Sequence, residues 1–104
     1  MYKVIILPLA KQDIKESAYW YNSRQQGLGK RFALQVRHTI TTLKETPFAF
    51  QVRYDDVRTV LLDVFPFMIH YNADGQHHLI IISAVLHTSR NPDLWNGERG
   101  SPNI

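Results

Sequence analysis

The sequence predicts an α+β fold: an N-terminal strand, an antiparallel helical hairpin and then a meander antiparallel sheet, with the helices packed on one sheet face. Three observations support this. A short β-branched segment comes first, two amphipathic helical segments follow, and apolar β-like segments occupy most of the remainder. This element order is typical of folds whose helices cover one face of a sheet. For 104 residues we expect a single domain over residues 1–95, with 96–104 as a loose C-terminal tail.

The first half of the chain predicts one strand and two helices. Residues 2–7, YKVIIL, are rich in β-branched side chains and are stopped by Pro8, which indicates a strand. Apolar residues then recur at helical spacing, at Ala10, Ile14, Ala18 and Tyr21. After a glycine-containing break at 22–29, a second helix is expected from about Lys30 to Glu45. Its apolar stripe consists of Phe32, Val36, Ile40 and Leu43. Because the link is short, the two helices should form a hairpin.

The second half predicts a sheet. Candidate strands are FQVRYD at 50–55, VRTVLLDV at 57–64, FPFMIHYN at 65–72 and HHLIIISAVLH at 77–87. The intervening ADGQ at 73–76 carries an Asp-Gly pair between apolar runs, which is a strong hairpin signal. The last strand is the longest, so we expect it to lie near the centre of the sheet.

Composition excludes several classes of protein. There is no cysteine, so disulfides and thiolate metal sites are excluded. His77 and His78 are adjacent in a predicted strand, where they would point to opposite faces and could not easily share a metal ion. We therefore expect no metal and no other cofactor. The absence of a long apolar segment or signal-peptide pattern favours a soluble cytoplasmic protein. A net charge of +3 suits an acidic partner, either nucleic acid or protein.

Three segments carry a resemblance to a known family. They are VIILPLAKQDIKESAYWY, DVRTVLL followed by FMIHY in the next strand, and the closing ISAVLHTSRNPDLW. In this order they resemble the RelE/ParE superfamily of toxins from bacterial type II toxin–antitoxin modules, and the closing pattern is nearer the ParE branch. The resemblance covers residues 2–95. It implies a small toxin that a co-expressed antitoxin holds inactive. RelE-like members cut messenger RNA on the ribosome, whereas ParE-like members poison DNA gyrase.

The candidate catalytic residues are His87, Arg58 and Arg90. Metal-free cleavage of RNA needs a base, cations for the phosphate and an acid. By the resemblance, RelE-like enzymes take these from lysines near the second helix, two strand arginines and a C-terminal Tyr or His. Here the segment 46–56 has one arginine and no lysine. His87 is either an acid–base residue, since imidazole titrates near neutrality, or a strand-end histidine bonded to nearby backbone. The incomplete set favours a binding protein over an enzyme.

Cations and aromatic side chains are the candidates for target or partner binding. Arg58 either faces the concave sheet surface together with Arg90 or forms a salt bridge with Asp55, Asp56 or Asp63. Trp95 either packs back onto the sheet or is an exposed aromatic beside a cation, a combination enriched in binding hot spots. Arg31 and Arg37 belong to a basic side of the second helix, with Lys30, His38 and Lys44. This side is either a solvated face or a surface for an acidic partner. Tyr19 and Trp20 lie off the first apolar stripe and could serve a surface contact.

We therefore expect a toxin that binds and poisons DNA gyrase and forms a hetero-oligomer with its cognate antitoxin. One alternative is a ribosome-dependent mRNA endoribonuclease. Another is a degenerate relative that binds an antitoxin without being toxic. An antitoxin segment could lie as a helix in a groove between sheet and hairpin, or add a strand at an exposed sheet edge.

Overall fold

The computed structural model describes residues 1–89 and confirms the predicted α+β architecture. The expected tail at 96–104 lies outside the described residues. The described elements are β1 (Lys3–Ile6), α1 (Pro8–Arg24), α2 (Leu28–Glu45), β2 (Val52–Tyr54), β3 (Val57–Leu61), β4 (Phe67–Asp74) and β5 (Leu79–His87).

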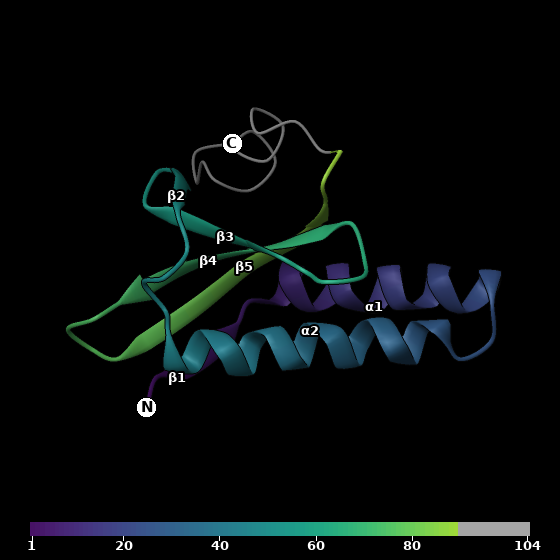
Figure 1. Cartoon of the computed structure of the whole chain (residues 1–104), viewed down its shortest axis with the longest axis horizontal. Helices are drawn as coiled ribbons and strands as arrows, with labels where there is room; N and C mark the ends of the chain where they lie inside the picture. Colours follow the sequence, from purple (N-terminus) through teal and green to yellow (C-terminus); the bar gives the residue numbers. More distant parts are fainter. Residues whose placement is uncertain (90–104) are drawn as a thin grey trace.

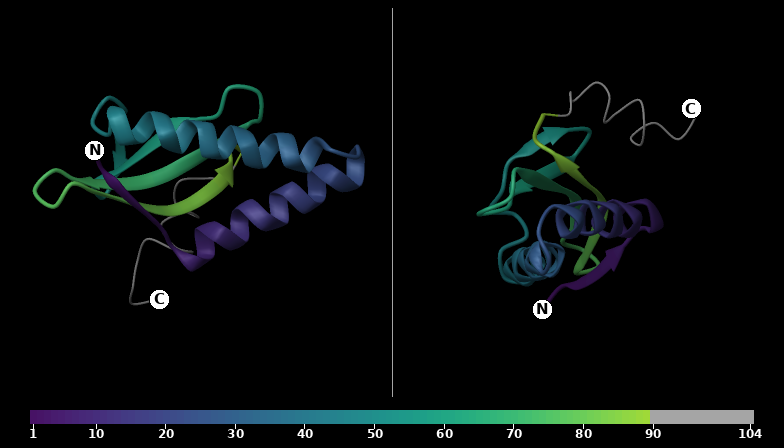
Figure 2. Two further views of the ribbon diagram at one scale, coloured as in Figure 1. Left: turned by 90° about the horizontal axis from the view of Figure 1, so that it is seen from below. Right: turned by 90° about the vertical axis from the view of Figure 1, so that its right-hand side faces the viewer.

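The strands form one mixed sheet in the order β1-β5-β4-β3-β2 (Figure 1). The last four strands pair antiparallel as the predicted meander, whereas β1 pairs parallel with β5. A parallel pair needs a long connection, which here includes the helical hairpin. The two helices run antiparallel and lie together against one face of the sheet (Figure 2). β1 and β2 are the edge strands, so β5 lies in the interior of the sheet, as expected, between β1 and the middle strand β4.

The helical hairpin depends on a proline and two glycines. Pro8 does more than end the first strand, because it opens α1, where its missing amide hydrogen leaves no helical bond unmade. Gly27 has φ +88° and caps α2, and its amide donates a hydrogen bond to Asn22 Oδ1 at 2.7 Å. This cap starts α2 at Leu28, slightly before the predicted Lys30. A Cβ on Gly29 would overlap the main-chain carbonyl of Ala18, so only glycine fits where the helices approach.

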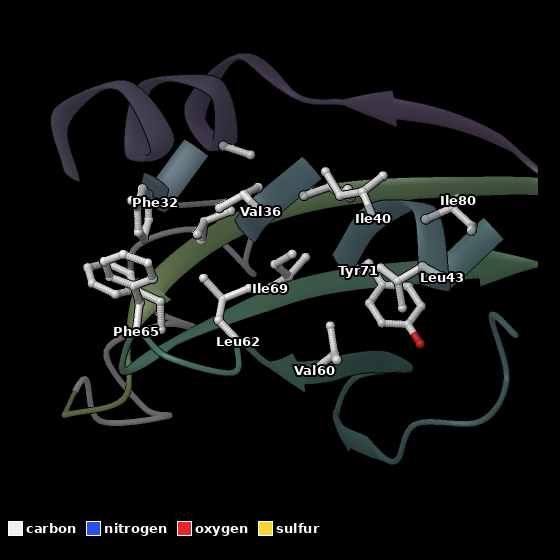
Figure 3. Close-up of a cluster of buried hydrophobic side chains, with 14 residues drawn as sticks. Phe32, Val36, Ile40, Leu43, Val60, Leu62, Phe65, Ile69, Tyr71 and Ile80 are labelled. Atoms are coloured by element: carbon white, nitrogen blue, oxygen red, sulfur yellow. The ribbon is translucent and has the colours of Figure 1, made fainter. Parts of the chain in front are cut away.

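The core fills the space between the hairpin and the sheet (Figure 3). Aromatic rings gather at one end of it, with centroids 4.9 Å apart for Tyr21 and Phe65 and 5.0 Å apart for Phe32 and Phe67. This confirms Tyr21 as a core contact of α1. The aliphatic part consists of Ala10, Val36, Ile40, Leu43, Val60, Leu62, Ile69, Ile80, Ile82 and Val85. Each large side chain buried in this way stabilises the fold by roughly 1.5–3 kcal/mol.

Two buried polar contacts tie the other elements to the sheet. β5 continues beyond the end of β1, and there Asp13 Oδ2 on α1 accepts the amide hydrogen of Val85 at 3.0 Å. Tyr71 on β4 donates its hydroxyl to the carbonyl of Pro47 at 2.7 Å. Burial raises the pKa of Tyr71 to about 12, although nearby Arg58 acts in the opposite direction. The Tyr71 hydroxyl therefore stays protonated and keeps its hydrogen bond to the Pro47 carbonyl.

The strand boundaries differ from the predictions by two or three residues in several places, and two of these differences have a clear cause. β3 ends at Leu61 instead of residue 64, because the amide of Phe67 donates to the carbonyl of Phe65 and so does not return a hydrogen bond to Leu62. The placement of His77 and His78 in a strand is wrong. They lie in the β4–β5 turn, where the carboxylate of Asp74 bonds the amide and ring of His77 and His78 has φ +50°.

Candidate partner-binding site

A hollow of about 520 Å³ lies where the second half of α1 passes the end of β5. We call it the α1–β5 pocket. It is lined by Glu16, Ser17, Trp20, Tyr21, Pro66, Phe67 and His87. Four of these come from α1, because positions spaced by four residues share one face of a helix. A mainly apolar hollow with a few polar groups at its rim is the usual form of a binding site.

His87 is the last residue of β5, and its ring lies edge-on to Phe67 with centroids 5.3 Å apart. The amide of Ser89 donates to His87 Nδ1 at 3.0 Å, and Ser89 Oγ lies 2.8 Å from the same nitrogen. Because an amide only donates, Nδ1 is an acceptor, and the neutral ring carries its proton on Nε2. The observed geometry is that of a strand-end histidine bonded to nearby backbone. Among residues 1–89 the only histidine–carboxylate pair is His77 with Asp74, so no described carboxylate orients His87.

The aromatic side chains of α1 divide between pocket and surface. Trp20 is 52% exposed at the pocket, with the guanidinium of Arg24 4.6 Å from its ring centroid. Tyr19 is 81% exposed but does not line the pocket. Burial raises the pKa of Tyr21, which keeps that phenol neutral inside the pocket wall. The pocket therefore offers an exposed indole beside a cation, while its phenol stays protonated.

Arg58 is held by the loop between α2 and β2. Its Nη1 donates to the carbonyl of Phe50 at 2.6 Å and to that of Phe48 at 3.5 Å, and the guanidinium lies 5.1 Å from the Phe48 ring centroid. Arg58 pairs with Tyr71, and cross-strand partners share a face, so it points to the side of the core and not to the open sheet face.

Both sequence-based interpretations of Arg58 therefore need correction. Within residues 1–89 it forms no salt bridge with Asp55, Asp56 or Asp63. The two earlier aspartates occupy the tight β2–β3 turn with positive φ, while the loop after α2 brings its carbonyls to the guanidinium. The contact still anchors sheet to loop, but through main-chain oxygens.

The basic residues of α2 form two rows and not one side. At about 100° per residue, Lys30, Arg37 and Lys44 fall in one row, and Arg31 and His38 fall in another about 100° away. Arg37 and Lys44 line a second groove, next to β1, whereas Arg31 is exposed outside both hollows. The structure thus separates Arg31 from Arg37.

Two predicted binding residues, Arg90 and Trp95, lie outside the described residues. Sequence reasoning missed four members of the α1–β5 pocket: Glu16, Ser17, Pro66 and Phe67. The helical spacing of positions 16, 17, 20 and 21 was a signal for the α1 wall. No sequence signal placed residues 66 and 67 opposite α1, because that contact depends on the tertiary fold.

Within residues 1–89 no group of three or more His, Asp or Glu side chains could hold a metal ion. No described helix combines the length and apolar character needed to cross a membrane.

The fold is that of the RelE/ParE superfamily of toxins. The chromosomal ParDE toxin–antitoxin system from P. aeruginosa has a similar chain, with a TM-score of 0.72 and 16% identity over 84% of this chain and 96% of that chain. For the intact E. coli RelBE toxin–antitoxin complex the TM-score is 0.66 and the identity is 15%, and the match covers 86% of this chain and 100% of that chain. For the isolated E. coli RelE toxin the TM-score is 0.65 and the identity is 14%, and the match covers 94% of this chain and 96% of that chain. At these identities the similarity establishes the fold alone.

The family follows from the sequence match. Residues 4–92 match the model of the ParE toxin of the type II toxin–antitoxin system, parDE. The match spans most of the chain, so the chain belongs to the ParE toxin family. None of the curated proteins compared with the chain matches it in sequence. The predicted superfamily and its ParE branch are confirmed.

Proposed function

We propose that this ParE-family toxin acts by binding and poisoning DNA gyrase and that a cognate antitoxin neutralises it. The observation that carries the proposal is the state of the candidate catalytic groups. His87 Nδ1 accepts hydrogen bonds from Ser89, and Arg58 is bonded to two loop carbonyls on the core side of the sheet. Cleavage of RNA needs a positioned acid–base pair and free cations at the phosphate, and these two residues do not supply that arrangement.

The α1–β5 pocket and its rim are the proposed contact for the target. Exposed Trp20 with the Arg24 guanidinium beside it is the combination that dominates protein–protein hot spots. Arg31 on α2, together with Arg90 and Trp95 from the C-terminal segment, remains a proposed contributor to binding.

A cognate antitoxin is supported by family membership and by the similar structures. The P. aeruginosa structure is described as a ParDE toxin–antitoxin system and the E. coli RelBE structure as a toxin–antitoxin complex. Binding to the folded toxin alone would also stabilise it by mass action.

The deciding experiment compares two activities of the purified chain. Relaxed plasmid, ATP and gyrase are incubated with the toxin at stoichiometric excess, and supercoiling is followed on gels. In parallel, the same toxin is added to ribosomes translating a defined messenger RNA, and cleavage is mapped by primer extension. We expect inhibited supercoiling and intact RNA. Unchanged supercoiling in the presence of folded toxin would sink the gyrase proposal.

Trp20→Ala tests the contact surface. Loss of a hot-spot aromatic costs about 2 kcal/mol or more, so the toxin concentration for half inhibition should rise roughly 30-fold. Tyr19→Ala is the matched control, because Tyr19 is a neighbouring exposed aromatic outside the pocket. It should change the concentration by less than about twofold. Equal effects of both variants would remove the pocket from the proposed contact.

The alternative activity, ribosome-dependent RNA cleavage, is favoured by the fold similarity to E. coli RelE. It predicts cut transcripts and normal supercoiling, and then loss of cleavage in His87→Ala. If neither activity appears while an antitoxin still binds, the chain is an antitoxin-binding relative without toxicity.

A further inference from the structure

The charge of the α1–β5 pocket is opposite in sign to that of the whole chain. Its lining contains one acid, Glu16, and no lysine or arginine. The chain as a whole carries a net charge of +3, so unspecific attraction would draw anions to the protein. A site that carries a local negative charge instead complements a positively charged group of a ligand. The pocket therefore suits a cation that the rest of the surface does not attract.

The carboxylate of Glu16 is available to such a cation. Within residues 1–89 no lysine or arginine forms an ion pair with it, and its neighbours three and four positions along α1 include neither residue type. Gln12 Nε2 donates to Glu16 Oε2 at 2.9 Å, which leaves Oε1 without a hydrogen bond from the described chain. An apolar side chain in the pocket would displace water from this carboxylate and offer nothing in return, which is unfavourable.

Four aromatic rings in the pocket wall meet at steep angles. Trp20 and Tyr21 have an interplanar angle of 81°, with centroids 5.1 Å apart. The angle is 60° between Tyr21 and Phe67, and 76° between Phe67 and His87. Because successive rings are far from coplanar, the wall presents ring faces in several directions. The face of an aromatic ring carries negative charge density, and clusters of such rings bind cations in other proteins.

A guanidinium group fits this combination better than an ammonium group. It is planar and less strongly hydrated, it stacks on aromatic rings, and it can form two parallel hydrogen bonds with one carboxylate. Trp20 already contacts a guanidinium, because Arg24 lies 4.6 Å from its ring centroid without itself lining the pocket. Trp20 follows Glu16 by four positions, so the indole and the carboxylate lie on one face of α1.

We propose that the α1–β5 pocket binds an arginine side chain of the target, whose guanidinium pairs with the Glu16 carboxylate and stacks against the aromatic wall. The identity of the target rests on the proposed function, whereas the arginine rests on the charge and the rings of the pocket. In this arrangement the target supplies the inserted side chain and the toxin supplies the cavity. Trp20 then contributes to binding as a stacking surface for the arginine.

The pocket is tested first with a defined ligand. The ¹⁵N-labelled full chain is titrated to millimolar concentrations with the capped peptide GGRGG and with its citrulline counterpart, which has nearly the shape of arginine but no charge. We expect the arginine peptide to shift the indole N–H of Trp20 and the amides of Ser17 and His87. It should bind at least about fivefold more tightly than the citrulline peptide.

Three results of this titration would overturn the proposal. They are equal binding of the arginine and citrulline peptides, tighter binding of the lysine peptide GGKGG, and the absence of shifts at Trp20, Ser17 and His87. The positive net charge of the chain makes the comparison stringent, because unspecific electrostatic attraction would not favour the arginine peptide.

Two neutralising variants supply a matched comparison. Glu16→Gln keeps the size of the side chain and its acceptor for Gln12, so the fold should be retained. It should weaken the arginine peptide about threefold to fivefold, as expected for one partly exposed ion pair. Glu45→Gln makes the same change in net charge at an exposed position outside the pocket, and screening should keep its effect below about twofold. Equal weakening by both variants would mean long-range electrostatics and would contradict the proposal.

The supercoiling assay separates this inference from the proposed function. Glu16→Gln should raise the toxin concentration for half inhibition of gyrase about threefold to fivefold, and Glu45→Gln should change it less than about twofold. Full inhibition by Glu16→Gln at the wild-type concentration would overturn the inference and leave the proposed function intact. A toxin that prefers the arginine peptide but does not inhibit gyrase would support the arginine pocket and contradict the proposed target.

Discussion

Replacement of Gly29 by alanine should destabilise the toxin, although alanine is the better helix former. Helix propensity alone would stabilise α2 by about 1 kcal/mol. Against this, the new Cβ overlaps the main-chain carbonyl of Ala18 and comes within 3.1 Å of Asn22 Cβ. The obstructing atoms include backbone, so α1 must move away from α2, and overpacking of this kind costs roughly 1–3 kcal/mol or more. Because the overlap is with main-chain atoms, we take the upper part of this range, about 2–3 kcal/mol. Subtracting the propensity gain of about 1 kcal/mol leaves a net loss of about 1–2 kcal/mol, which lowers Tm by roughly 4–15 °C for a domain of this size.

The assay is thermal unfolding of the wild type and Gly29→Ala by circular dichroism, with urea denaturation as a second measure. Ala18→Gly in the Gly29→Ala background should not restore stability, because the obstructing oxygen belongs to the main chain. A Tm equal to or above that of the wild type would mean that propensity outweighs the contact. The reasoning about a close helix–helix approach at Gly29 would then be wrong.

Three further predictions concern buried contacts and pH. Because the pKa of Tyr71 is raised from 10.0 to about 12, the stability that it contributes is complete below pH 10 and is lost as pH rises toward 12. Tyr71→Phe should remove this alkaline dependence in urea titrations, and an unchanged slope would contradict the assignment. Asp13→Ala should cost about 1–3 kcal/mol by leaving the buried amide of Val85 without its acceptor. Asp13→Asn should cost less in the same denaturation assay. The contact with His77 lowers the pKa of Asp74 below 3.8, so its contribution is present above that pH and lost as pH falls through the lowered pKa. In His77→Ala the carboxyl titration followed by NMR should move upward, and no movement would count against the contact.

Local patterns were sufficient for most of the fold. Helical spacing predicted α1 and α2, the Asp-Gly pair predicted the β4–β5 turn, and the length of the last strand predicted its place in the interior of the sheet. The errors were at strand boundaries, where a single hydrogen bond determines whether the ladder continues, as at the Phe67 amide. The parallel pairing of β1 with β5 had no local signal, because it joins residues far apart in the sequence.

The candidate site was harder to predict for the same reason. The α1–β5 pocket combines side chains from positions 16–21, 66–67 and 87, which no spacing rule connects. Arg58 carries the charge expected of a phosphate ligand, yet the partner that holds it is a pair of carbonyls at Phe48 and Phe50. Every residue has such a carbonyl, so residue type alone could not identify this contact.

The parallel pairing of β1 with β5 also sets the time at which the toxin can be completed during translation. Lys3 pairs with Leu79, 76 positions later. At about 5–20 residues per second, the ribosome needs roughly 4–15 s to make the intervening chain. The helical hairpin contains local contacts and can form within that time, but β1 has no neighbour until β5 emerges. A chain interrupted before residue 79 retains both helices but lacks β5, the strand that joins β1 to β4, so interrupted synthesis yields no completely folded toxin.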